Sequence, residues 1–129
     1  MVGDEVVARA RAAVGARFRP QGRSVEEGLD CIGLAAFACA VPDARRDYAV
    51  SAWQTFEFEA GLEAAGFAKV DEAGAGDLLL VRAGPRQLHV LVLTGDGFVH
   101  ADARLRRVVE VPGAVPWPAV SAWRQVEGQ

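Results

Sequence analysis

Cysteine, histidine, tyrosine and methionine are all scarce in this chain of 129 residues, which has two cysteines, two histidines, one tyrosine and one methionine. Cys31 and Cys39 lie in a stretch that predicts a helix, where eight residues would separate their Cα atoms by about 12 Å. A disulfide needs less than about 7 Å, so we expect both thiols to be free. Any site made of thiols or imidazoles must therefore use Cys31, Cys39, His89 or His100.

Long apolar runs and massed charge are also missing. No apolar run approaches the roughly 20 residues of a membrane helix, so we expect no membrane span. The N-terminal residues carry acids at Asp4 and Glu5 instead of the apolar core of a secretory signal, which predicts synthesis in the cytoplasm. The 14 basic residues are scattered and the formal net charge is −3. This pattern does not indicate a nucleic-acid partner.

The composition is that of one ordinary globular domain over residues 1–129, with 51% hydrophobic and 24% charged residues. Apolar residues recur at helical spacing in the first half and form short continuous runs in the second half. The pattern predicts helices over residues 4–16, 30–39 and 52–65, and strands over residues 78–81, 88–93, 98–101, 108–111 and 122–126. Helices followed by an antiparallel meander form an α+β fold.

Cys31 lies at the predicted start of the second helix, directly after Asp30, which is a preferred N-cap residue. Backbone N–H groups and the helix dipole favour an anion at this position, so we expect the pKa of the thiol to lie below its free value of about 8.5. The glycines Gly28 and Gly33 on either side would let a substrate backbone approach. These features are typical of a catalytic thiolate, although a cysteine in such Ala-rich surroundings is also a common small core residue.

The two histidines flank a predicted hairpin turn at 94–97. With a loop of two or four residues, Leu91 pairs with His100, and His89 and His100 become diagonal neighbours on one face of the sheet. A loop of three residues would place them on opposite faces. A thiol, a base and an orienting polar group form the arrangement of nucleophilic catalysis. The same three side chains, Cys31, His89 and His100, could instead ligate zinc.

Several ordered segments resemble the NlpC-type cell-wall cysteine peptidases, a family with a papain-like fold. The segment Gly-Leu-Asp-Cys-Ile-Gly-Leu at 28–34 is similar to the family's nucleophile motif Gly-x-Asp-Cys-Ser-Gly-Leu. Gly-Asp-Leu-Leu-Leu at 76–80 resembles the strand that precedes the family histidine, and the segments at 89–93 and 98–101 resemble its two histidine strands. Val-Gly-Ala-Arg-Phe at 14–18 is similar to the Gly-x-x-Tyr segment that precedes the nucleophile motif in the family. The order and spacing fit across residues 5–111.

The resemblance implies a role for each matching position. Cys31 would be the nucleophile that forms a thioester, His89 the general base, and His100 the residue that orients His89. Asp30 matches a position that helps to bind a peptide amino group, and Phe18 and Ile32 fall at substrate-side positions. The implied activity is hydrolysis of peptide bonds in peptidoglycan stems or cross-links, with no cofactor and no resident metal.

Two of these positions depart from the family pattern. Phe18 replaces a tyrosine whose hydroxyl contributes to the oxyanion hole or to substrate binding, and Ile32 replaces a serine. With an apolar residue after the nucleophile, the chain resembles the branch of the family that is attached to phage tails and phage-like gene-transfer particles. This resemblance implies delivery to the periplasm or cell wall by such a particle. The departures also leave open a weak or inactive structural component of a tail with the same fold. Trp117, between two prolines, is a candidate for the rim of a groove.

Overall fold

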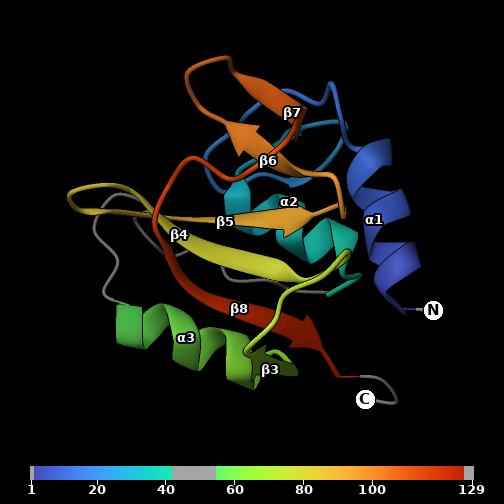
Figure 1. The fold of residues 1–129 in the computed structure, drawn as a ribbon. Coiled ribbons are helices and arrows are strands. Elements are labelled where there is room, and N and C mark those ends of the chain that lie inside the picture. The colour runs from blue at the N-terminus through green and yellow to red at the C-terminus, as the bar shows by residue number, and fades with distance from the viewer. Residues whose placement is uncertain (1, 42–54, 127–129) are drawn as a thin grey trace.

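A computed structural model describes residues 2–41 and 55–126 of the chain. Within these residues the elements follow one another in the order helix, two short strands, two helices and six strands (Figure 1). The helices are α1 (Val2–Ala12), α2 (Cys31–Ala38) and α3 (Thr55–Ala64), and the strands are β1 (Arg23–Ser24), β2 (Gly28–Leu29), β3 (Phe67–Val70), β4 (Leu78–Gly84), β5 (Gln87–Leu93), β6 (Gly97–Asp102), β7 (Arg107–Pro112) and β8 (Ala119–Gln125). The α+β expectation is confirmed.

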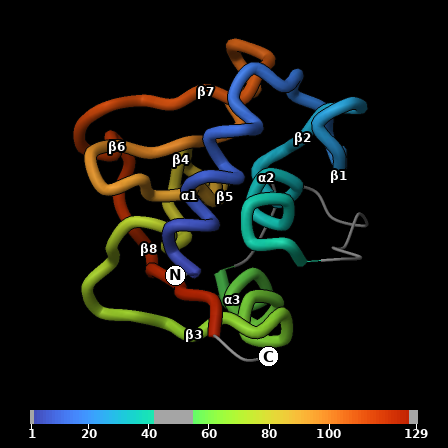
Figure 2. The backbone as a smooth tube through the Cα atoms, turned by 90° about the vertical axis from the view of Figure 1, so that its right-hand side faces the viewer, coloured from blue at the N-terminus to red at the C-terminus, as the bar shows by residue number. Residues whose placement is uncertain are grey.

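The six longer strands form one antiparallel sheet in the order β3-β8-β4-β5-β6-β7. The expected meander from β4 to β7 forms one side of the sheet and ends at the edge strand β7, while β8 pairs with the other side of β4 and β3 lies beyond it. Figures 1 and 2 show α1 and α2 on one side of this sheet and α3 beside β3 and β8. No helix among the described residues is long and apolar enough to cross a membrane.

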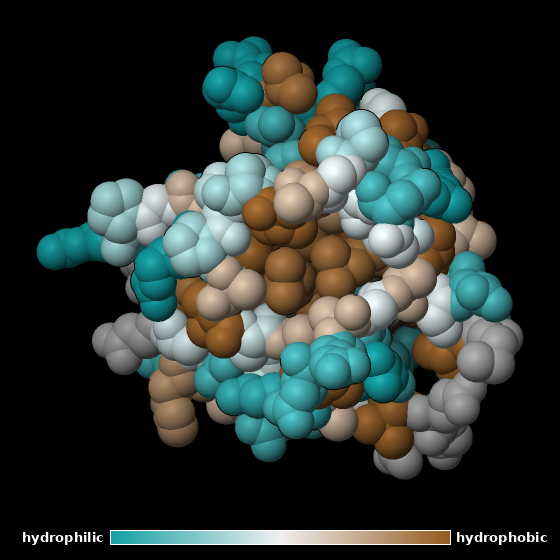
Figure 3. Space-filling view, in the orientation of Figure 1, coloured by the Kyte–Doolittle hydropathy of each residue, from teal (hydrophilic) through white to brown (hydrophobic). Residues whose placement is uncertain are grey.

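Both faces of the central strands are covered, which explains why these strands read as continuous apolar runs in the sequence. On one face, Leu80, Val90 and Val99 join the core under α1 and α2. On the other face, Leu91 and Phe98 belong to a second apolar cluster. Figure 3 shows apolar side chains gathered in the middle of this second face, over β4 and β5, with polar groups around them.

The helix α2 is anchored by side chains that are fully removed from solvent. Leu34 and Ala38 have no exposed surface, and burial of a leucine side chain contributes about 2 kcal/mol. The helix begins at Cys31 and ends at Ala38, in agreement with the expected span of 30–39.

Several boundaries and small elements differ from the sequence expectation. The helix expected over 4–16 ends at Ala12, because the chain turns there and the Gly15 N–H donates to the carbonyl of Val108 in β7 at 2.9 Å. The strands β1, β2 and β3 were not expected, and each is four residues long or shorter. The first three residues of the helix expected over 52–65 lie outside the described residues.

Candidate active site

Asp30 caps α2 and ties its first turn to the preceding loop. One carboxylate oxygen accepts the Gly33 N–H at 2.8 Å, and the other accepts the Gln21 N–H at 2.6 Å. The Arg23 guanidinium lies 3.2 Å from Asp30 Oδ1. The side chain of Asp30 is fully buried, so its oxygens hold the start of α2 in place. The expected N-cap is confirmed, and the binding of a substrate amino group by Asp30 stays a prediction.

The two glycines near Cys31 allow the protein's own backbone to pack closely. A Cβ on Gly33 would collide with the carbonyl oxygen of Gly22, and one on Gly28 would lie 2.7 Å from the Cβ of Arg19. Gly28 also has a φ of 116°, in the region that favours glycine. The expectation that these glycines leave room for a substrate backbone is wrong, because neighbouring chain segments fill that space.

Cys31 is buried at the start of α2, where its thiol meets β5. Burial has the largest effect on the pKa of this thiol and raises it, and the carboxylate of Asp30 raises it as well. The backbone N–H groups of Val90, Ile32 and Cys31 itself lower the pKa by less. The net result raises the pKa of Cys31 to about 12. The expectation of a lowered pKa is therefore wrong for this state, because removal from water disfavours the thiolate more than the helix start favours it.

His89 and His100 lie in direct contact. The hairpin pairs Val92 with Val99 and Leu93 with Phe98, and the same register continued places His89 and His100 on one face, as expected. His89 Nε2 lies 3.0 Å from His100 Nδ1, and the ring planes are close to perpendicular, at 82°. One imidazole therefore donates a hydrogen bond to the other.

The ladder between β5 and β6 has only these two pairs, although both strands continue past them toward the histidines. The helix α2 packs on both strands, and the Val90 N–H faces the Cys31 thiol. The structure thus brings the thiol next to the residue that follows His89. No hydrogen bond joins the Cys31 thiol to His89 among the described residues.

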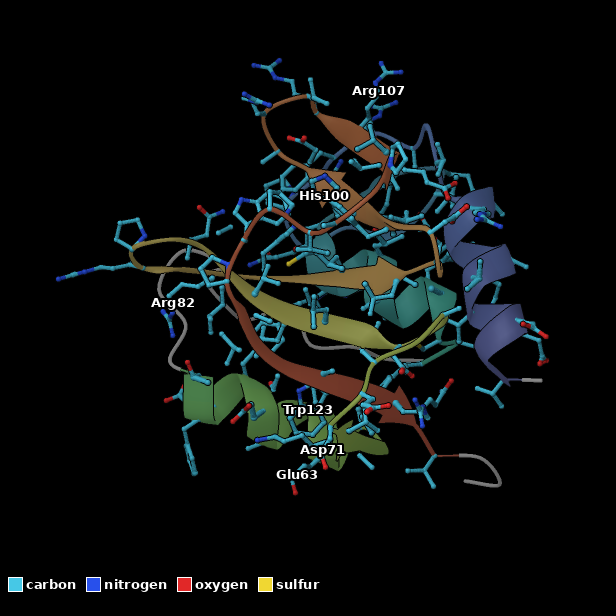
Figure 4. All side chains as sticks on the ribbon, viewed as in Figure 1. Glu63, Asp71, Arg82, His100, Arg107 and Trp123 are labelled. Carbon is cyan, nitrogen blue, oxygen red and sulfur yellow. The ribbon has the colours of Figure 1, made fainter. Side chains whose placement is uncertain are left out.

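Trp117 covers the histidine pair on the second face of the sheet. Its ring centroid lies 5.6 Å from that of His89 and 5.4 Å from that of His100. Figure 4 shows His100 on β6, above β5 in this view. Burial, followed by the neighbouring His100, lowers the pKa of His89 to about 4, although Asp102 acts in the opposite direction. Burial also lowers the pKa of His100, while Asp102 raises it. Both imidazoles are therefore neutral at pH 7.

The other residues singled out in the sequence lie at the edges of this arrangement. Phe18 and Ile32 are half-buried and pack against the main core, and the Phe18 N–H donates to the Arg106 carbonyl at 2.9 Å. Their contact with a substrate stays a prediction. Cys39 is buried at the end of α2, and both cysteines are free thiols, as expected.

The sequence analysis did not single out Asp102. Its Oδ2 atom lies 3.8 Å from His100 Nε2, so it faces the nitrogen that His89 does not contact. The signal was present in the sequence, because residues two apart on a strand share a face and Asp102 is two residues after His100.

A zinc site would need several ligand atoms that converge on one point. Among residues 2–41 and 55–126, no three His, Cys, Asp or Glu side chains are grouped so that they could hold a metal ion. The contact between His89 and His100 uses a ring nitrogen of each residue, so these nitrogens face one another and not a common centre.

No protein-family model and no curated protein matches the sequence. Solved structures do match the fold. The NlpC/p60 domain of the peptidoglycan hydrolase SagA superposes with a TM-score of 0.65 and 24% sequence identity, over 95% of this chain and 98% of that one. The P60 domain of antigen MAP1204 from M. avium subspecies paratuberculosis gives 0.63 and 20%, over 96% and 93%.

NlpC2 from Trichomonas vaginalis gives a TM-score of 0.69 at 17% identity, over 96% of this chain and 47% of that one. Each of these identities is below 25%, so the comparisons establish a shared fold. The NlpC-type fold expected from the sequence motifs is confirmed.

Proposed function

We propose that this protein is a cysteine peptidase that cleaves peptide bonds of peptidoglycan, with Cys31, His89 and His100 as its catalytic residues. The observation that carries the proposal is the buried contact of 3.0 Å between the two imidazoles, formed beside a helix that presents a buried thiol at its first residue. Two neutral, linked imidazoles, together with a thiol that meets the backbone of the strand carrying His89, are the parts that nucleophilic catalysis requires.

The contact between the imidazoles determines which nitrogen can act as the base. When His89 Nε2 carries the proton and donates it to His100 Nδ1, His89 Nδ1 has a free lone pair. That nitrogen can accept the proton of the Cys31 thiol when the two groups come together. Hydrogen bonds of catalytic groups are often long in the free protein and tighten when a substrate binds.

The reaction then proceeds in two halves. Cys31 Sγ attacks the peptide carbonyl carbon as its proton passes to His89, and N–H groups at the start of α2 stabilise the oxyanion. The C–N bond breaks, the amine leaves with the proton from His89, and a thioester remains. Water, deprotonated by His89, attacks the thioester carbonyl. The C–S bond breaks, and the proton returns to the sulfur.

The pKa values indicate that thiol and imidazole are both neutral in the free protein. The pKa of Cys31 is about 12 and that of His89 is about 4, so a preformed thiolate–imidazolium pair is unfavourable. The proton therefore transfers during the attack, and His89 acts as a general base in the transition state. Neighbouring N–H groups from α2 and from Val90 stabilise the negative charge as it develops on sulfur.

The assignment of peptidoglycan as substrate is supported by the fold. One of the structures that it resembles is a domain of a peptidoglycan hydrolase, and the motif around Cys31 resembles that of cell-wall peptidases.

The proposal is tested by digestion of purified peptidoglycan with wild-type protein, Cys31→Ala and Cys39→Ala, with mass spectrometry of the released peptides and their new amino ends. Cys39 is a matched control, because it is a second buried thiol, at the C-terminal end of α2, and burial also raises its pKa to about 12. We expect Cys31→Ala to abolish cleavage and Cys39→Ala to retain it. Full cleavage by folded Cys31→Ala would overturn the proposal.

The second candidate function is a weak or inactive structural component of the same fold. It is favoured by Phe18, which has no hydroxyl at a position where the family has a tyrosine, since loss of one oxyanion donor costs about 10²–10³-fold in rate. The digestion distinguishes the two candidates. Folded wild-type protein that releases no peptide, while Phe18→Tyr does, would favour the inactive component.

We further propose that a phage-like particle carries the protein to the cell wall. The support is the apolar residue Ile32 after the nucleophile, which resembles the phage-associated branch. Genes for tail components next to its own gene, together with the protein in purified particles, would support this route. Absence of the protein from such particles would contradict it.

A further inference from the structure

Asp102 completes a row of three polar side chains on one face of β5 and β6. His89 contacts His100 through Nε2 and Nδ1 at 3.0 Å, and the other nitrogen of His100, Nε2, lies 3.8 Å from Asp102 Oδ2. The side chains of His100 and Asp102 are only 7% and 17% exposed. The carboxylate therefore acts on the imidazole with little screening by water.

The loop after β6 fixes the orientation of this carboxylate. Asp102 Oδ1 accepts the N–H groups of Arg104 at 2.9 Å and Leu105 at 3.0 Å, which leaves Oδ2 as the oxygen that faces His100. Arg107 lies opposite Asp102 in the register of β6 and β7, but no ion pair joins the two among the described residues. The two oxygens of Asp102 thus have separate partners.

The state of His100 decides whether His89 can be a base. For His89 Nε2–H to donate, His100 Nδ1 must be an acceptor, so the proton of the neutral His100 ring must be on Nε2. That proton points toward the negative charge of Asp102. With the opposite tautomer, His100 Nδ1–H would donate to His89 Nε2 and put the His89 proton on Nδ1, where it blocks transfer from the thiol.

We propose that Asp102 is a positioning residue that holds His100 in the Nε2–H tautomer and thereby keeps Nδ1 of His89 free to accept a proton. The catalytic consequence rests on the function proposed above, whereas the effect on the tautomer does not. The direction of the electrostatic effect agrees, because the charge of Asp102 raises the pKa of both His89 and His100.

The informative variant is Asp102→Asn, because the loop keeps the orientation of the side chain. The amide oxygen takes the place of Oδ1 and accepts the N–H groups of Arg104 and Leu105. The amide NH₂ then takes the place of Oδ2 and presents a donor to His100 Nε2. A donor at this point favours a His100 Nε2 atom that carries no proton, so the proton of His100 moves to Nδ1. The hydrogen bond between the two imidazoles is then reversed, with His100 as the donor.

The control variant is Asp102→Ala, which removes both the loop acceptor and the charge. It leaves the tautomer of His100 unbiased, so it should reduce kcat about 10-fold, whereas Asp102→Asn should reduce kcat by about 10²–10⁴-fold with little change in KM. Stability should follow the opposite order, because only Asp102→Asn keeps the loop hydrogen bonds. If Asp102 had only a structural role, the more stable variant would be the more active one.

The test combines urea unfolding and peptidoglycan cleavage with ¹⁵N NMR of the imidazole nitrogens in the whole protein. We expect wild-type His100 as the Nε2–H tautomer and Asp102→Asn with the Nδ1–H tautomer. An unchanged tautomer in folded Asp102→Asn, or a kcat within twofold of wild type, would overturn the inference. A changed tautomer in a protein whose wild type cleaves nothing would overturn the proposed function and leave the positioning effect of Asp102 in place.

Discussion

Burial of the His89 imidazole makes the stability of this fold decrease as the pH falls. The pKa of His89 is about 4 in the folded protein, below the ordinary value of 6.5, first because the ring is buried and then because His100 is close. Between pH 6.5 and 4 the unfolded chain binds a proton that the folded protein does not. The contribution of this lowered pKa to the free energy of unfolding is therefore present above pH 6.5 and is lost as the pH falls toward 4.

The size of the effect follows from the two pKa values. The difference between 6.5 and about 4 corresponds to about 3 kcal/mol. About 2 kcal/mol of this is lost between pH 7.5 and pH 5.0. Such a loss is large beside a typical domain stability of about 5–15 kcal/mol. The lowered pKa of His100 acts in the same direction.

The assay is urea unfolding of wild-type protein and His89→Gln at pH 7.5 and pH 5.0. Glutamine stays neutral over this range, and its amide can still donate to His100 Nδ1. His100 and the carboxylates are present in both proteins, so the difference between them isolates His89. We expect wild type to lose about 2 kcal/mol more than His89→Gln. Equal losses would show that burial does not keep His89 neutral and would refute the reasoning.

Two further predictions concern the start of α2. Asp30→Ala should lower the free energy of unfolding by about 3 kcal/mol, because it removes the cap of α2 and the ion pair between Asp30 and the buried Arg23. Asp30→Asn, which keeps a cap oxygen, should lose less, and equal losses in thermal or urea unfolding would contradict this account. Alkylation of Cys31 by iodoacetamide at pH 8.5, measured by mass spectrometry in Cys39→Ala, should be about 10³-fold slower in the folded protein than in urea. Equal rates would contradict a thiol pKa of about 12.

Features that depend on neighbouring residues could be predicted from the sequence. The cap of α2 follows from Asp30 in front of an apolar helix, because a carboxylate before the first turn accepts an unpaired N–H. The alignment of His89 with His100 follows from a short turn, because its length fixes the register of a hairpin. In both cases the partners lie within about eleven positions of each other along the chain.

Features that depend on distant segments could not be predicted in this way. The strand β3 pairs with β8, whose residues lie more than fifty positions further along the chain, and its four residues carry no clear period of their own. The packing of Gly33 on Gly22 depends on a loop whose path the sequence does not specify. The alternation of side chains along a strand could have placed Asp102 on the same face as His100, but its importance depends on which nitrogen of His100 faces it.

The sequence by itself determined the residues of the candidate site. It did so through the rarity of cysteine and histidine, the helix start at Cys31 and the hairpin that aligns His89 with His100. Only the tertiary structure decided the charge state of these groups. A helix start favours a thiolate, yet the packing of α2 on β5 and β6 removes Cys31 from water and raises its pKa. Desolvation depends on every chain segment that covers a group, and so it cannot be deduced from the residues on either side of that group in the sequence.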